Sequence, residues 1–91
     1  MAKVWIPSLL RNFTQGRESL QIPGTSVRQV IDNLEVIYPG IKERLCDGAE
    51  LRRGIAVAVN AQLAPGGLNQ AVSEESEVHF VPAISGGGAD S

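Results

Sequence analysis

Few side chains in this 91-residue sequence are of the types that perform covalent chemistry. It contains one cysteine, Cys46, and one histidine, His79. A lone cysteine excludes an intramolecular disulfide and a metal site built from cysteines, and a lone histidine excludes a histidine-rich metal site. A hydrolase or transferase needs a nucleophile and a base together in a pocket, and the sequence offers no such pair. We therefore expect a protein that has no catalytic residues of its own and binds no metal or cofactor.

The remaining titratable candidates have simpler structural interpretations. Cys46 lies after a short helical turn and is typical of a small packing residue rather than a thioester donor. Glu74, Glu75 and Glu77 belong to a charged turn and indicate a solvated cap on the strand that follows. His79 has no second histidine or cysteine in the same strand, so its position favours a surface role over catalysis.

Composition and charge are those of a small globular domain. Apolar residues are 43% of the chain and charged residues 20%, and eight basic against ten acidic side chains give a net charge of −2. Nucleic-acid binding needs a basic face that displaces counterions, so this balance argues against it. No apolar run approaches the ~20 residues that cross a bilayer, and the first residues lack the pattern of a secretory signal. We expect one soluble, cytoplasmic domain that contacts neither nucleic acid nor membrane.

Hydrophobic periodicity defines the elements that must position any functional residue. The helix is the clearest of them, because Ser26 and Gln29 have the spacing of a capping box and Tyr38-Pro39-Gly40 ends it. Its apolar stripe consists of Val27, Val30, Ile31, Leu34 and Ile37. One further helical turn is expected at residues 41–46. Alternation predicts strands at residues 3–7, 18–22, 55–59 and 77–82, and a short strand at 68–72 after the turn Pro65-Gly66-Gly67.

Together these elements predict an α+β fold. Residues 8–17 contain Asn12, Thr14 and Gly16 and predict a connecting loop, and the polar residues 47–54 predict another. A single main helix covers one face of a mixed sheet of four to five strands and leaves the other face open. Residues 1–82 make up this domain. Residues 83–91 are mostly small and lack periodicity, which predicts a flexible C-terminal tail.

The last strand and the tail carry a resemblance to a known family. Val81-Pro82-Ala83-Ile84-Ser85-Gly86-Gly87 resembles the end of the ubiquitin-like sulfur carriers related to the molybdopterin synthase small subunit and the thiamine sulfur carrier (MoaD/ThiS). The segments 4–11 and 58–60 are similar to this family too. Residues 38–45 look most like the branch that supplies sulfur for cysteine synthesis (CysO-like). The resemblance covers residues 3–87 and implies a β-grasp, ubiquitin-like roll.

The chemistry that the resemblance implies belongs to the backbone. A partner related to ubiquitin-activating enzymes (E1-like) would use ATP to adenylate the carboxylate of Gly87, presented by the tail residues Ile84, Ser85 and Gly86. Sulfur then displaces AMP and leaves a thiocarboxylate, which a synthase accepts for cysteine, molybdopterin or thiamine synthesis. Glycine suits this task because it has no Cβ to obstruct a narrow channel. Residues 83–87 reach at most ~17 Å, at about 3.3–3.6 Å per residue.

One departure from the family pattern follows the double glycine. The mature family members end at Gly-Gly, whereas Gly88-Ala89-Asp90-Ser91 follows Gly87 here. We expect a precursor from which a peptidase removes residues 88–91. The spacing from Pro82 favours a cut after Gly87, and a cut after Gly88 stays open. The alternatives are a cloning remnant and a chain that has lost the carrier role.

The open face of the sheet predicts a docking surface. Trp5, Ala56, Ala58, His79 and Val81 alternate with core-facing residues, and in a β-grasp sheet their strands are neighbours. They would form a flat, partly apolar patch for the activating partner. The alternative is an ordinary surface, because scattered exposed apolar residues are common.

Three other functions compete with the carrier. A ubiquitin-like modifier, joined to lysines of target proteins, begins with the same activation and is not separated from the carrier by sequence. A plain β-grasp interaction module would not need the double glycine. A [2Fe–2S] ferredoxin shares the roll but needs four cysteine ligands, which one cysteine excludes.

Overall fold

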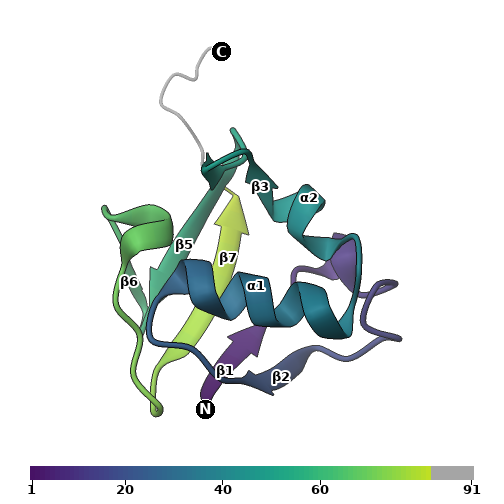
Figure 1. Ribbon diagram of the computed structural model, residues 1–91, viewed down its shortest axis with the longest axis horizontal. Helices are drawn as coiled ribbons and strands as arrows, with labels where there is room; N and C mark the ends of the chain where they lie inside the picture. The colour runs from purple at the N-terminus through teal and green to yellow at the C-terminus, as the bar shows by residue number, and fades with distance from the viewer. Residues whose placement is uncertain (83–91) are drawn as a thin grey trace.

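A mixed five-stranded sheet forms one layer of the molecule. The computed structural model describes residues 1–82. The sheet consists of β1 (Ala2–Trp5), β2 (Ser19–Ile22), β5 (Ile55–Val59), β6 (Gln62–Leu63) and β7 (Glu77–Pro82), in the spatial order β2-β1-β7-β5-β6. β7 lies between β1 and β5, parallel to β1 and antiparallel to β5 (Figure 1). With one main helix across one face, this is the predicted β-grasp roll.

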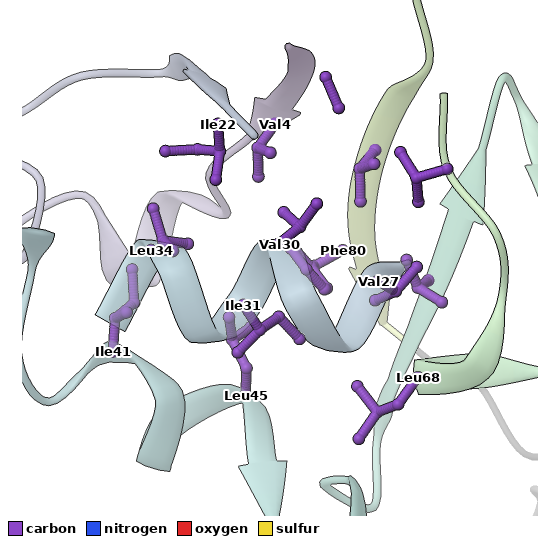
Figure 2. Close-up of a cluster of buried hydrophobic side chains, with 14 of the residues drawn as sticks. Val4, Ile22, Val27, Val30, Ile31, Leu34, Ile41, Leu45, Leu68 and Phe80 are labelled. Carbon is purple, nitrogen blue, oxygen red and sulfur yellow. The ribbon is translucent and has the colours of Figure 1, made fainter. Parts of the chain in front are cut away.

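The helix α1 (Val27–Ile37) supplies the other layer. Its residues Val27, Val30, Ile31 and Leu34 are buried, as the apolar stripe predicts. Figure 2 shows Val4 and Ile22 on the sheet side of α1, and Ile41 and Leu45 of the short helix α2 (Ile41–Leu45) on its other side. The expected contribution of Ile37 to the core is wrong, because its side chain is 53% exposed. Ile37 falls at the margin of the stripe, in the last turn of the helix.

The start of α1 is capped as the spacing predicts, with one difference. The Ser26 Oγ accepts a hydrogen bond from the Gln29 backbone N–H at 3.2 Å. In a capping box the side chain at position 29 would accept from the backbone of Ser26. Here Gln29 Oε1 accepts from the backbone N–H of Thr25 at 2.7 Å, one residue earlier. The cap therefore also anchors the connection between β2 and α1.

The predicted strand at residues 68–72 is wrong. A 3-10 helix, η2 (Gly67–Asn69), occupies its start, and an isolated bridge between Ser26 and Ala71 is its only strand-like pairing in the structure described. Leu68 and Val72 are both buried, so packing against α1 outweighs extension into a strand. Likewise Gly66-Gly67 leads into this helix and is not a turn between two strands.

Two short pairings arise in segments that the sequence did not mark as strands. β6 follows β5 through Asn60 and Ala61, which both adopt positive φ. Such a left-handed pair matches the twist of a two-residue hairpin. In the predicted loop 47–54, β3 (Cys46–Asp47) pairs with β4 (Glu50–Leu51). Strands of two residues are too short to show alternation, which is why sequence periodicity misses them.

The segment between β1 and β2 forms a folded loop. Its first part is a 3-10 helix, η1 (Ser8–Leu10), which follows Pro7. The buried Thr14 hydroxyl lies 3.2 Å and 2.9 Å from the carbonyl oxygens of Arg11 and Arg17, which holds the remainder in shape. No helix among residues 1–82 is long enough and apolar enough to span a lipid bilayer.

Candidate functional site

The five residues predicted to form a docking surface lie on adjacent positions of three strands. Trp5 of β1 is paired with His79 of β7, which is paired with Ala58 of β5, and Ala56 is paired with Val81. All five side chains are half-buried, and none belongs to the core beneath α1. We call these five residues the docking face. The structure therefore brings together the residues that the sequence placed on the open side of the sheet.

Trp5 is held in position by three neighbours. Its indole N–H donates a hydrogen bond to Glu77 Oε1 at 3.1 Å. The His79 ring stacks on it with a centroid separation of 5.4 Å and an interplanar angle of 11°. Lys3 Nζ lies 4.5 Å from the centre of the Trp5 ring, a distance at which cation–π attraction is effective. An aromatic side chain fixed in this way loses little conformational entropy when a partner covers it.

Glu77 has a more specific position than the predicted solvated cap. Besides accepting from Trp5, its carboxylate lies 3.8 Å from His79 Nε2. Its backbone N–H donates to Asn60 Oδ1 at 2.9 Å, and its carbonyl accepts from the Asn60 N–H. The start of β7 is thus attached both to the β5–β6 turn and to the docking face. Glu74 and Glu75 are exposed in the turn, as predicted.

The tail residues Ile84, Ser85, Gly86, Gly87 and Gly88 lie outside the described residues. What the structure does define is the point from which they start. Pro82 is paired with Ile55 at the end of β7, the central strand of the sheet. A segment that follows this strand leaves from the same end of the sheet as the Val81 side of the docking face.

A groove that the sequence did not predict lies beside Pro82. It has a volume of about 600 Å³. One wall comes from η1 and the loop after it, and the other from the ends of β5 and β7. We call it the η1 groove and define it by Leu9, Leu10, Phe13, Arg44, Phe80 and Pro82. The signal in the sequence was three large apolar residues within a segment predicted to be a polar loop.

Cys46 has the packing role that its sequence context predicts. Its side chain is buried at the end of α2. Burial raises the pKa of the Cys46 thiol, because the thiolate would lose its hydration. The protonated thiol is a poor nucleophile. Among residues 1–82, no group of three or more His, Cys, Asp or Glu side chains is arranged to hold a metal ion.

This arrangement is suited to presenting a chain end to another protein. The docking face, the η1 groove and the end of β7 adjoin one another, since Val81 belongs to the face and also lines the groove. A protein that covered the face at Val81 would lie next to Pro82, the last described residue before the tail. Chemistry at a backbone carboxylate beyond Pro82 would then take place among the partner's residues.

Comparison with known proteins covers nearly the whole chain. The sequence model of the ThiS family matches residues 4–87. The sulfur carrier protein CysO of Mycobacterium tuberculosis is 37% identical over 89 residues, which cover 92% of this chain and 96% of CysO.

Solved structures agree with the sequence comparison. The crystal structure of Mycobacterium tuberculosis CysO superposes with a TM-score of 0.84 and 35% identity, covering 92% of this chain and all of that one. A chain of the Amycolatopsis orientalis BexX/CysO complex superposes with a TM-score of 0.87 and 36% identity, covering 96% of this chain and all of its own length. Because the family match extends from β1 to the double glycine, this chain belongs to the ThiS family.

Proposed function

We propose that this protein is a sulfur carrier, a co-substrate rather than an enzyme, whose functional group is the carboxylate of Gly87. The observation that carries the proposal is the extent of the family match, which runs through residue 87 and so includes the double glycine. The 37% identity to the sulfur carrier protein CysO supports it. The fold supports it too, because the central strand β7 leads directly into this tail.

The proposed reaction starts with the tail. Gly87 is followed by Gly88, so its carboxylate becomes free when a peptidase hydrolyses the Gly87–Gly88 peptide bond with one water. An oxygen of that carboxylate then attacks the α-phosphorus of ATP in an adenylating enzyme, and pyrophosphate leaves. Sulfide attacks the acyl carbon and expels AMP, and loss of the remaining S–H proton leaves a thiocarboxylate. ATP is used by the partner, and this chain binds no cofactor of its own.

The docking face is proposed to bind the adenylating enzyme. Its flat alanine positions beside the fixed Trp5 ring suit a partner with a complementary apolar surface. The thiocarboxylate then passes to a sulfur-accepting synthase. The relatives named CysO favour the cysteine branch over molybdopterin and thiamine, and one of them was crystallised in a complex with a second protein, BexX. We expect these steps to take place in the cytoplasm.

Intact mass spectrometry of the untagged protein from its own cells tests the proposal. The expected species ends at Gly87 and carries sulfur in place of one oxygen. As a control for the cut site, chains ending at Gly87 and at Gly88 are incubated with the adenylating enzyme, ATP and sulfide without peptidase, and only the first is expected to form a thiocarboxylate. A chain that still ends at Ser91 after exposure to the peptidases of its host would overturn the carrier role. Covalent adducts on lysines would assign the chain to the protein modifiers.

The docking face makes a separate prediction. Val81→Asp is expected to weaken binding to the adenylating enzyme about tenfold or more, because a carboxylate would be desolvated at the centre of the contact. Val36→Asp, at an 80% exposed position of α1, is the matched control and should leave binding unchanged. Isothermal titration measures the dissociation constants, and circular dichroism checks that both variants are folded. Equal affinity for wild type and Val81→Asp would remove the docking face from the proposal.

A further inference from the structure

The η1 groove exists because β7 extends beyond β1. β1 ends at Trp5, which is paired with His79, and Pro7 then directs the chain away from the sheet. The three following residues of β7, 80–82, are paired with β5 and have no strand partner on the β1 side in the structure described. This end of β7 leaves side chains rather than a pairing edge at the groove, because Pro82 has no N–H.

The wall of the groove opposite the end of β7 is preformed. Arg11 Nε donates to the Ile6 carbonyl at 3.1 Å, which fixes the exit from β1. The backbone N–H of Phe13 donates to the Leu10 carbonyl at 3.0 Å, and the contacts of the buried Thr14 hydroxyl close the loop. Phe13 packs against the core, whereas the Leu9 side chain is 89% exposed at the rim of the groove. Covering an apolar side chain that a rigid rim holds in water lowers the free energy of the complex and so favours binding.

Arg44 adds a charge to this apolar site. Its guanidinium carbon lies 5.7 Å from the centre of the Phe13 ring. Within residues 1–82, Arg44 makes no ion pair and no side-chain hydrogen bond. A guanidinium that lies over an aromatic ring keeps its donors available, and carboxylates fit these donors in a bidentate manner. The groove therefore combines apolar walls with one cationic group that has no protein acceptor.

We propose that the η1 groove is a second contact site for the adenylating enzyme, and that it receives a segment with an apolar side chain and a carboxylate. The apolar side chain contacts Leu9 and Phe13, and the carboxylate binds Arg44. This inference rests on the proposed function, because Pro82, the last described residue before the tail, itself lines the groove. Because Arg44 is positively charged, the side chain that binds it must carry a negative charge.

Equilibrium binding tests the groove independently of the docking face. The full chain and its variants are isolated from their own cells, and their affinity for the purified adenylating enzyme is measured by titration calorimetry. Leu9→Ser and Arg44→Glu are each expected to weaken binding about tenfold, and Arg44→Lys to retain most of the affinity. Val36→Ser and Arg17→Glu are the matched controls, since they make the same chemical changes at exposed side chains that do not line the groove. All five variants should melt at the wild-type temperature.

The outcomes separate this inference from the proposed function. If Leu9→Ser and Arg44→Glu bind with unchanged affinity and still form a thiocarboxylate, the proposed contact at the groove is wrong and the carrier role stands. Tighter binding by both variants would mean that the chain's own residues after Pro82 occupy the groove, which also overturns the proposal. Self-association of the wild type that Leu9→Ser abolishes would assign the groove to a second copy. Wild-type protein that does not bind the enzyme at all contradicts both proposals.

Discussion

Glu35 shows how one side chain can connect two elements of this fold. Its carboxylate accepts hydrogen bonds from the backbone N–H groups of Gly40, at 3.0 and 3.1 Å, and of Lys42, at 2.8 Å. These N–H groups are unpaired donors at the start of α2, where negative charge is favoured. The two backbone hydrogen bonds hold the pKa of Glu35 below its ordinary value of 4.5. The carboxylate thereby fixes the angle between α1 and α2.

Glu35→Gln is therefore expected to lower the melting temperature at pH 7. A carboxyl group with a lowered folded-state pKa stabilises the fold above about 4.5, and this contribution disappears as the pH falls through the folded-state pKa. The difference between wild type and Glu35→Gln should accordingly shrink in acid. Thermal melts at pH 7 and at about pH 3 measure it. Glu74→Gln, in the exposed turn, is the control and should show little difference at either pH. A constant difference for Glu35→Gln would contradict this account.

At the scale of elements, Gly24 determines how β2 leads into α1. It has a φ of +152°, which side chains of L-residues rarely allow. A Cβ at this position would lie 2.7 Å from Val30 Cγ2 and 2.9 Å from the Val30 backbone nitrogen. The obstacle is the helix backbone itself and not the end of a flexible side chain. Only glycine lets the chain pass this close to α1.

Gly24→Ala should thus destabilise the fold by about 3 kcal/mol, the sum of backbone strain and of overpacking against α1. Gly16→Ala is the matched control, because Gly16 also has a positive φ, +85°, but nothing lies within 4 Å of the added Cβ. It should cost only about 1 kcal/mol from the backbone conformation. Urea denaturation of both variants gives the difference. Equal losses would show that the contact with Val30 is relieved without cost.

At the scale of the whole molecule, one core joins the sheet and both helices. Four completely buried side chains, Leu34, Val4, Ile41 and Val78, come from four different elements. A chain of this length has a stability of roughly 5–14 kcal/mol, by the rule of about 0.05–0.15 kcal/mol per residue. The sheet and the helices therefore cannot unfold separately without exposing the same side chains to water.

Leu34→Ala tests this cooperativity. It is expected to lose about 3 kcal/mol, because the cavity lies between α1 and its neighbours and the surroundings relax only in part. Helix signal from circular dichroism and Trp5 fluorescence from the open sheet face should still give coincident transitions. Val36→Ala, on the 80% exposed side of the same helix, should change stability by less than about 0.5 kcal/mol. Separate transitions for the two probes would show that helix and sheet do not share one core.

The sequence by itself determined the features that depend on local periodicity. The strands at residues 55–59 and 77–82 have the bounds that alternation predicts, because side chains on successive residues must point to opposite faces. The helix follows from its apolar stripe and from the Ser26 cap. The resemblance to the family and the double glycine could also be recognised from the sequence, since both depend on contiguous residues.

Only the tertiary structure decided the features made by residues far apart in the chain. Trp5 and Glu77 are 72 residues apart, and their hydrogen bond depends on the parallel pairing of β1 with β7. Residues 68–72 begin with the end of a 3-10 helix and form no strand, because burial of Leu68 and Val72 outweighed a weak local preference. The η1 groove needs η1, α2 and the ends of two strands at once. Local pattern shows which face a side chain takes, whereas packing in three dimensions decides which residues it meets there.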